Sequence, residues 1–378
     1  MTIIIISTVL TLAYTVLMLA YHKGWKRQRE FVLPQSYEPA TRISIIIPAR
    51  NEEANIGACL DAIYAQKYPQ ELLEVIVVDD HSTDATAAVV GQYADRGVIC
   101  VPLAAELAEG KTLAYKKAAL AAGIARSTGT LIVTTDADCV APNTWLAHIA
   151  GLYEQQQPAM IVGPVTYHSV PSVVGVFQLT DFVSMQGITA AAHELKLGNM
   201  SNGANLAFSR QAYDAVGGYM GIDHMASGDD YLLMHKMMKA KAEPIAYLHT
   251  QHAIVRTLPQ PDWKSFLQQR IRWASKSGKY GDVRLTLILL LVYLFNAGLL
   301  ALAIAGFADA QWWYLAVAML VAKVAAEAYF LRPVASFYKV IYIFRYFVLL
   351  QPLHVLYIVL AGFLGFFGSY SWKGRTVK

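Results

Sequence analysis

The chain is poor in charged residues. Only 15% of its 378 residues are charged and 56% are hydrophobic, and its mean hydropathy is positive. This composition is too apolar for a purely soluble protein, whereas the polar middle region excludes a simple bundle of membrane helices. The net charge of +4 is modest, and basic residues cluster beside hydrophobic segments. We therefore expect contact with an anionic membrane surface and not with nucleic acid.

Cysteine is scarce as well. The three cysteines, Cys59, Cys100 and Cys139, are scattered, and no pair has the Cys-x-x-Cys spacing of zinc and redox motifs. This pattern excludes a disulfide framework and argues against a zinc site. We expect reduced thiols in a part of the chain that faces the cytosol.

A long uncharged run is present near the N-terminus. Residues 3–21 are apolar and of about the length that crosses a bilayer, and Lys23, Lys26, Arg27 and Arg29 follow directly. A cleaved signal peptide has the opposite charge order, so residues 1–22 are predicted to be an uncleaved anchor. The positive-inside rule then places the N-terminus outside and the following chain in the cytoplasm.

The chain becomes apolar again over residues 284–371. The predicted segments are residues 285–307, 312–331, 337–350 and 352–370. The third segment is expected to be an interfacial helix or half of a broken span, and the others to be membrane spans. Lys323 and Glu327 are spaced to pair on one helix face. Three clean spans would put the basic tail outside, against the positive-inside rule, so the side of the C-terminus stays open.

Between these segments, residues 42–283 have the pattern of an α/β domain. The β-type runs are residues 44–48, 75–78, 98–101, 131–135 and 159–165. The helical patterns between them are residues 52–66, 85–93 and 111–125. This alternation predicts a mostly parallel sheet with helices on both faces. Ligands bind such sheets at the carboxyl ends of the strands.

Two aspartates, Asp136 and Asp138, follow the run 131–135. Residues two apart on a strand share a face, so both carboxylates can point at one hard cation. Mg²⁺ or Mn²⁺ needs only one or two protein carboxylates when a phosphorylated substrate supplies further oxygens. Taken alone, such a pair is more often part of an ordinary surface turn.

Two more polar clusters end predicted strands. After the run 44–48, Arg50 and backbone N–H groups suit a nucleotide or its phosphates, although Asn51 could simply cap a helix. After the run 75–78, Asp79 and Asp80 are placed to bind a base or ribose, although residues 82–84 could be only an N-cap.

Two clusters occur later in the chain. Asp229 and Asp230 precede a helical pattern, where a carboxylate can act as a general base or merely cap the helix. In the segment 269–273, an arginine side chain offers a planar donor fork for a diphosphate, and Trp273 offers a flat stacking surface suited to the membrane interface. An interfacial belt of basic and aromatic residues would explain this second segment almost as well.

In this order, the clusters resemble the family-2 glycosyltransferases, inverting nucleotide-sugar enzymes with the Rossmann-like GT-A fold. The similarity covers about residues 42–280. It rests on SIIIPARNEE, VVDDHSTD, the segment of Lys111, TDAD, SNGANLAFSR, SGDD and QRIRW. The flanking membrane segments are similar to those of ceramide glucosyltransferases, carotenoid-ester glycosyltransferases and processive polysaccharide synthases.

The resemblance implies roles for individual residues. Asp80 would contact the base, with Asp79 beside it. Asp138 would be the main metal ligand, with Asp136 next to it facing the ribose or sugar. Asp230 would be the catalytic base, but Asp229 stands where the family has Glu, so the choice between the two stays open. The further substrate-binding residues implied are Pro48, Arg50, Glu52, Lys111, Gly203, Gln269, Arg272 and Trp273.

The expected activity is that of a metal-dependent hexosyltransferase in the inner cell membrane, with its catalytic domain in the cytoplasm. It would move a sugar from a nucleotide-diphosphate sugar, UDP-linked by resemblance, to a lipid-linked or other apolar acceptor. One alternative is a processive polysaccharide synthase. Another is a non-catalytic nucleotide-sugar-binding membrane protein. The sugar, the nucleotide, the acceptor and the oligomeric state stay open.

Overall fold

The computed structural model describes residues 1–105, 114–168, 172–198, 200–225, 228–240, 243–275, 281–367, 370–372 and 375–377. The chain divides into two compact units. The sheet unit comprises Arg29–His168 and Met200–Leu258, and the helical unit comprises Met1–Gln28, Ser169–Asn199 and Pro259–Lys378. The domains expected from the sequence, 1–22, 42–283 and 284–371, stay predictions.

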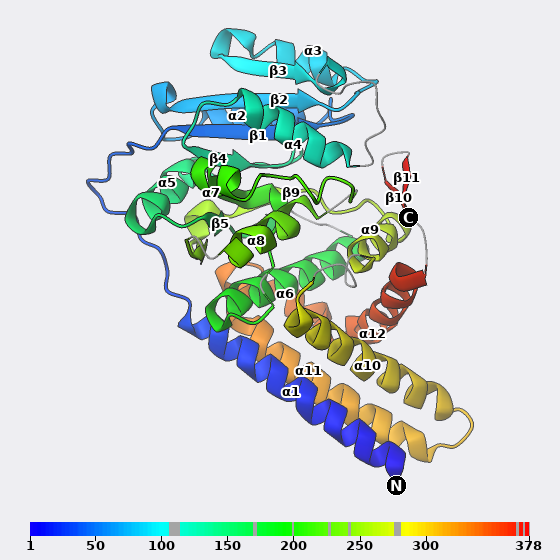
Figure 1. Cartoon of the computed structure of the whole chain (residues 1–378). Helices are drawn as coiled ribbons and strands as arrows, with labels where there is room; N and C mark the ends of the chain where they lie inside the picture. The colour runs from blue at the N-terminus through cyan, green and yellow to red at the C-terminus, as the bar shows by residue number, and fades with distance from the viewer. Residues whose placement is uncertain are drawn as a thin grey trace. The chain divides into compact units, whose positions relative to one another are not determined.

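The sheet unit is built on a seven-stranded sheet with the order β3-β2-β1-β4-β7-β5-β8 (Figure 1). Its strands are β1 (Ile43–Ala49), β2 (Leu73–Asp79), β3 (Val98–Pro102), β4 (Leu131–Thr134), β5 (Met160–Val162), β7 (Leu206–Ser209) and β8 (Ile245–Tyr247). β1 to β4 are parallel, and β7 runs antiparallel to β4 and β5. The predicted mostly parallel α/β sheet is confirmed.

Helices pack on this sheet. They are α2 (Ile56–Tyr64), α3 (Thr86–Gly91), α4 (Tyr115–Arg126), α5 (Trp145–Gln156), α7 (Arg210–Ala215) and α8 (Asp229–Ala240). The isoleucines of β1 are fully buried, as expected for a central strand covered on both faces. α4 approaches the sheet closely at Gly123, where a Cβ atom would lie 2.6 Å from a methyl group of Ile46. This close approach requires glycine.

One predicted strand, residues 159–165, is wrong in its extent. The run divides into β5 and β6 (Val165–Tyr167), and β6 pairs with β9 (Val255–Thr257) in a separate two-stranded sheet. Gly163 and Pro164 separate the two pieces. Pro164 lacks the N–H that would continue a ladder, which explains why the chain leaves the large sheet there.

The helical unit contains α1 (Thr2–Arg27), α6 (Val173–Leu195), α9 (Trp263–Ala274), α10 (Val283–Ala305), α11 (Gln311–Phe337) and α12 (Phe344–Phe367), followed by the short strands β10 (Tyr370–Trp372) and β11 (Arg375–Val377). α1 packs along α6, α10 and α11 (Figure 1). Within the described residues, four helices are long and apolar enough to cross a membrane: α1, α10, α11 and the segment Ile341–Phe366.

The predicted break between residues 337–350 and 352–370 is wrong. α11 continues to Phe337 with Pro333 inside it, and α12 continues through Pro352. In apolar surroundings, a helix keeps its remaining backbone hydrogen bonds because the alternative leaves polar groups unpaired, so proline is tolerated. The predicted pair of Lys323 and Glu327 is confirmed, with Nζ 2.6 Å from Oε1.

Candidate active site

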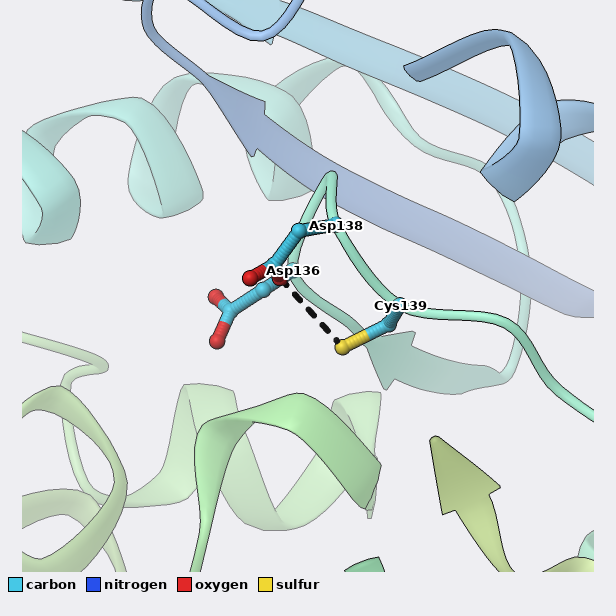
Figure 2. A group of neighbouring side chains, drawn as sticks. All are labelled: Asp136, Asp138 and Cys139. Atoms are coloured by element: carbon cyan, nitrogen blue, oxygen red, sulfur yellow. Dashed lines mark hydrogen bonds between the residues drawn. The ribbon is translucent and has the colours of Figure 1, made fainter. Parts of the chain in front are cut away.

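The Asp136–Asp138 pair lies in a turn and not on a strand. β4 ends at Thr134, and the N–H of Cys139 donates to the carbonyl of Asp136 at 3.1 Å. The alternation of side chains along a strand therefore does not explain why Asp136 and Asp138 lie together, and that expectation is wrong. The turn nevertheless gathers the side chains: one ligand atom each of Asp136, Asp138 and Cys139 lies within 4.8 Å of the others (Figure 2).

The electrostatics of this turn fit a hard divalent cation. Burial raises the pKa of Asp138 to about 6, and the nearby Asp136 and Glu52 add to the shift. Two carboxylates this close repel each other, and a cation between them relieves the repulsion. Asp138 is oriented by Thr257, whose hydroxyl donates to Oδ2 at 3.0 Å.

Cys139 is a poor ligand for such an ion. Burial raises the pKa of its thiol well above the usual range, and Asp138 and Asp136 raise it further, so the sulfur keeps its proton. Mg²⁺ and Mn²⁺ also prefer oxygen to sulfur. The donor set that fits either ion is therefore the two carboxylates of Asp136 and Asp138, and their role as metal ligands stays a prediction.

Lys116 is a residue of this site that the sequence did not single out. Its Nζ lies 2.8 Å from Oδ1 of Asp136 and 3.4 Å from Oδ2 of Asp229. Burial alone would lower the pKa of Lys116, but the charges of Asp136 and Asp229 outweigh it and raise the pKa. Lys116 therefore stays protonated and links the turn after β4 to the start of α8. The predicted helix over residues 111–125 contained it, but no sequence pattern showed which way it points.

Asp229 and Asp230 are the first two residues of α8. The side chain of Asp229 is buried beside Lys116. Asp230 accepts from the N–H of Gly203 at 3.2 Å and from the N–H of Tyr231 at 2.7 Å. The bond to the N–H of the next residue lies within the first turn of α8 and is not an N-cap bond, which reaches two or three residues ahead. The structure also brings both predicted candidates for the base to the same cluster.

Gly203 lies against this cluster. A Cβ atom at residue 203 would lie 3.2 Å from Oδ2 of Asp229 and 3.4 Å from Nζ of Lys116. Any larger side chain would therefore push on the ion pair. This contact accounts for a glycine at the position that was predicted to bind substrate.

The loops after β1 and β2 also meet at the carboxyl edge of the sheet. Arg50 donates to the carbonyl of Asp80 at 2.8 Å and lies 3.9 Å from its carboxylate. Asp79 accepts from the N–H of Ser82 at 3.2 Å. Glu52 accepts from the side chain of Asn55 at 2.9 Å. Pro48 lies in β1 in register with Val78.

Asn51 joins these two loops. Its side-chain oxygen accepts from the N–H of Thr83 at 2.8 Å, and its own N–H donates to the hydroxyl of Ser82 at 3.0 Å. The alternative role of Asn51 as a helix cap is therefore wrong. The capping role proposed as an alternative for residues 82–84 is wrong as well, because the N-cap of α3 is Ala85; Asp84 accepts from the N–H of Thr86 at 3.0 Å without being the cap. We call the two hydrogen bonds that join Asn51 to Ser82 and Thr83 the loop interlock.

The other predicted substrate residues belong elsewhere. Lys111 lies outside the described residues. Gln269, Arg272 and Trp273 lie in α9 of the helical unit. Their roles toward a substrate stay predictions.

Comparison with known proteins identifies the family. The model of "Glycosyl transferase family group 2" matches residues 131–365, more than half of the chain, and "Glycosyl transferase family 2" matches residues 44–217. The probable glycosyltransferase YdaM of Bacillus subtilis is 27% identical over 242 residues, covering 62% of this chain and 54% of YdaM. The β-monoglucosyldiacylglycerol synthase of Synechocystis is 27% identical over 190 residues, covering 48% of this chain and 37% of the synthase.

A solved structure supports the fold. The chain is similar to a mannosyltransferase from Pyrobaculum calidifontis in complex with GDP-Man and Mn²⁺, with a TM-score of 0.54, 21% identity, and coverage of 96% of this chain and 98% of the other. The chain spans about half the length, or less, of the two curated relatives. The matched family model, together with a GT-A sheet ending in this carboxylate cluster, shows that the chain belongs to the family-2 glycosyltransferases.

Proposed function

We propose that this glycosyltransferase moves a sugar from a nucleotide-diphosphate sugar to a hydroxyl of a membrane lipid or lipid-linked acceptor, with inversion at the anomeric carbon. The observation that carries the proposal is the carboxylate cluster around Lys116, in a chain that also has four helices apolar enough to span a membrane. The curated synthase from Synechocystis, whose name specifies a glucosyldiacylglycerol product, supports a lipid acceptor.

On the donor side, Asp138 and Asp136 would hold Mg²⁺ or Mn²⁺. The ion, when bound, would neutralise charge on the diphosphate. The solved neighbour holds Mn²⁺ and GDP-Man, which supports the ion and the class of donor. UDP is the proposed carrier by family resemblance. Its nucleotide would lie against the residues after β1 and β2, namely Pro48, Arg50, Glu52, Asp79 and Asp80, with Lys111 also assigned to the donor.

We assign Asp230 as the general base. The carboxylate of Asp229 is engaged in the ion pair with Lys116, at 3.4 Å from its Nζ. Asp230 is held by backbone N–H groups at the entrance of α8. It would accept the proton of the acceptor hydroxyl while the oxygen bonds to the anomeric carbon and the bond to the diphosphate breaks. Attack from the face opposite the leaving group inverts the configuration.

We propose that the protein is a multi-pass protein of the inner cell membrane with its sheet unit in the cytoplasm. Lys26 and Arg27 in the last turn of α1 support this orientation, because basic residues favour the cytoplasmic side. α9 carries Gln269, Arg272 and Trp273, which would hold the diphosphate and the acceptor end. An apolar acceptor would reach the site from the bilayer.

The test uses the purified full chain in lipid nanodiscs with Mg²⁺ or Mn²⁺, a panel of nucleotide sugars and host lipids. We expect nucleotide release and a lipid that gains the mass of one sugar. Asp138→Asn and Asp230→Asn should each lower the rate by at least about 100-fold. The matched control is Asp61→Asn, since the Asp61 side chain is 66% exposed and belongs to a surface ion pair with Arg96.

The products separate the alternatives. A polymer would replace this proposal by a processive synthase. Donor binding without nucleotide release would replace it by a non-catalytic binding protein. Near-normal transfer by Asp230→Asn would move the base to another residue.

A further inference from the structure

Arg270 lies in the middle of the Gln-Arg-Ile-Arg-Trp segment of α9 and contacts two of its neighbours. Its Nη1 donates to Oε1 of Gln269 at 2.8 Å. Its guanidinium carbon lies 4.2 Å from the ring centre of Trp273 and 4.6 Å from that of Phe266. Only 4% of its side chain is exposed. The position of this guanidinium therefore affects where Gln269 and Trp273 lie.

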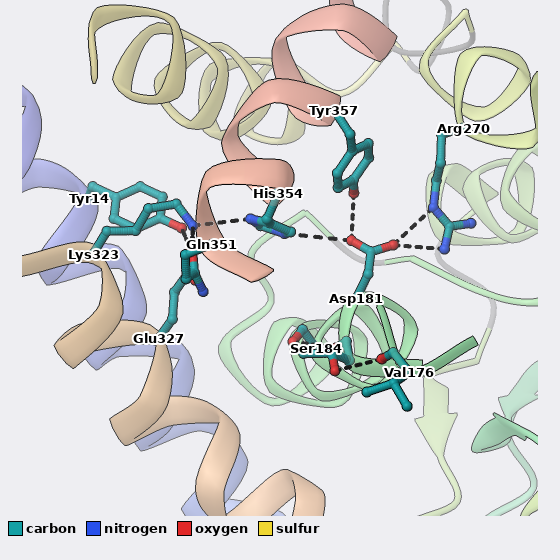
Figure 3. Close-up of polar contacts among 11 residues, drawn as sticks. Tyr14, Val176, Asp181, Ser184, Arg270, Lys323, Glu327, Gln351, His354 and Tyr357 are labelled. Atoms are coloured by element: carbon teal, nitrogen blue, oxygen red, sulfur yellow. Dashed lines mark hydrogen bonds and ion pairs between the residues drawn. The ribbon is translucent and has the colours of Figure 1, made fainter. Parts of the chain in front are cut away.

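Asp181 of α6 is the counter-ion of Arg270. Its Oδ2 lies 2.9 Å from Nε and 2.7 Å from Nη2 of Arg270 (Figure 3). Its Oδ1 accepts from the hydroxyl of Tyr357 at 2.5 Å and lies 3.7 Å from Nε2 of His354. Burial would raise the pKa of Asp181, but Arg270 and then His354 and Tyr357 outweigh it and lower the pKa to about 2. Asp181 is thus a buried carboxylate at neutral pH.

The polar contacts continue into the candidate membrane helices. Nδ1 of His354 lies 3.1 Å from Nζ of Lys323, which is fully buried. Lys323 contacts Glu327 of its own helix and Gln351 of α12, each at 2.6 Å. The hydroxyl of Tyr14 in α1 donates to Glu327. Figure 3 shows these side chains as one chain of contacts from α1 and α11 through α12 to Asp181.

We propose that Asp181 is a positioning residue for the substrate-binding segment of α9. It acts through Arg270, which sets the place of Gln269 and Trp273, and its second oxygen ties this assembly to α12. The inference rests on the proposed function, in which Gln269 and Trp273 hold the diphosphate and the acceptor end. It gives a reason why the charges of Asp181 and Arg270 are kept buried in the helical unit.

The physical basis is the cost of a broken buried ion pair. When one partner is removed, the other charge remains buried without compensation. Arg270 would then move to find another acceptor or water, and its contacts with Gln269 and Trp273 would move with it. A displacement of about 1 Å in a binding group can lower a rate about 100-fold.

A double-mutant cycle tests this path. The variants are Asp181→Asn, Arg270→Met, the double variant and Asp181→Glu, all in the full chain in nanodiscs. We expect each neutral single variant to lower kcat/KM by about 10- to 100-fold. The double variant should be no worse than Arg270→Met alone, because Asp181 acts through Arg270. Asp181→Glu should recover part of the loss, since it keeps the charge.

The matched control is Gln178→Met in the same helix. Gln178 is fully buried and exchanges two hydrogen bonds of 2.9 Å with the main chain of Gln260. The control removes buried hydrogen bonds from α6 without touching the ion pair, so kcat/KM should stay within about twofold of wild type. Additive losses in the cycle, or an equal loss in Gln178→Met, would overturn the inference.

Hydrogen–deuterium exchange gives a readout that does not need activity. We expect faster amide exchange in α9 (Trp263–Ala274) in Asp181→Asn, with exchange in Gln178→Met unchanged there. If wild type transfers no sugar from any donor, the proposed function fails, and the exchange still decides whether Asp181 positions α9. If wild type is active and Asp181→Asn changes neither exchange nor kcat/KM, this inference fails and the proposed function stands.

Discussion

Lys116 gives two carboxylates of the candidate site the same positive partner. It lies within ion-pair distance of Asp136, a proposed metal ligand, and of Asp229, the neighbour of the proposed base. Without Lys116, three or more acidic groups would share one partly buried region with less compensation. The lysine therefore lets the fold keep a concentrated negative charge at the place where we propose that a cation and a diphosphate bind.

Replacing Lys116 by methionine should separate its charge from its bulk. We expect the transfer rate of Lys116→Met to fall by about 100-fold, because Asp136 and Asp229 lose the cation that orients them. Initial rates of nucleotide release at several Mn²⁺ concentrations measure the effect. Lys239→Met is the control, since Lys239 is exposed in the last turn of α8. Equal rates in the two variants would refute this role of Lys116.

Single residues show where sequence reasoning succeeds and where it stops. Asp136 and Asp138 could be predicted because they follow a buried strand, although a turn and not strand alternation brings them together. Lys116 could not be predicted in this role. Its partners lie 20 and 113 residues away in the chain, and only the tertiary fold brings them to it.

At the scale of elements, the buried parallel strands were the most predictable part. β1, β2 and β4 are rich in Val, Ile and Leu, which is the pattern of strands covered on both faces, and the edge strand β3 is partly exposed. β7 was not predicted, because its sequence Leu-Ala-Phe-Ser contains none of the Val and Ile residues that mark the predicted strands. α6 was missed for another reason. It is buried on several sides, so its sequence does not alternate between an apolar and a polar face, which is the pattern that identifies a surface helix.

The contact of α4 with the sheet gives a test at this scale. In a helix, Gly→Ala normally stabilises by up to about 1 kcal/mol. At Gly123 the new Cβ would lie 2.6 Å from Ile46, and such overpacking costs about 1–3 kcal/mol. We therefore expect Gly123→Ala to lower the unfolding temperature measured by scanning fluorimetry.

Gly91 supplies the matched control, since a Cβ there would meet no atom within 4 Å. Gly91→Ala should leave the unfolding temperature unchanged or raise it. If both alanine variants shift the temperature by the same amount and in the same direction, the close packing of α4 on β1 has no energetic effect.

At the scale of the whole molecule, the sequence predicted both kinds of structure that the chain contains. Its low charge and its apolar runs indicated membrane helices, and four described helices meet that requirement. The positions at which one membrane helix ends and the next begins were harder to predict. The sequence predicted a new segment beginning at Pro352, whereas α12 runs from Phe344 to Phe367 with Pro352 inside it.

The apolar helices predict how the whole chain behaves in cells. We expect the full chain to stay in the membrane pellet after alkaline carbonate extraction and to enter solution only with detergent. Leu287 and Val321 illustrate the reason, since both are largely exposed on candidate spans. Release of the chain by carbonate would show that it is attached to the membrane surface only.

The loop interlock has a consequence for the proposed binding of a donor. Asn51 and His81 have positive φ angles of 52° and 55°, a conformation that few residues adopt without support from their surroundings. The reciprocal hydrogen bonds between the two loops supply that support without any bound ligand. In the proposed function, less conformational entropy would then be lost when a nucleotide binds, because the two loops already hold each other in place. A substitution in either loop should therefore weaken binding through both.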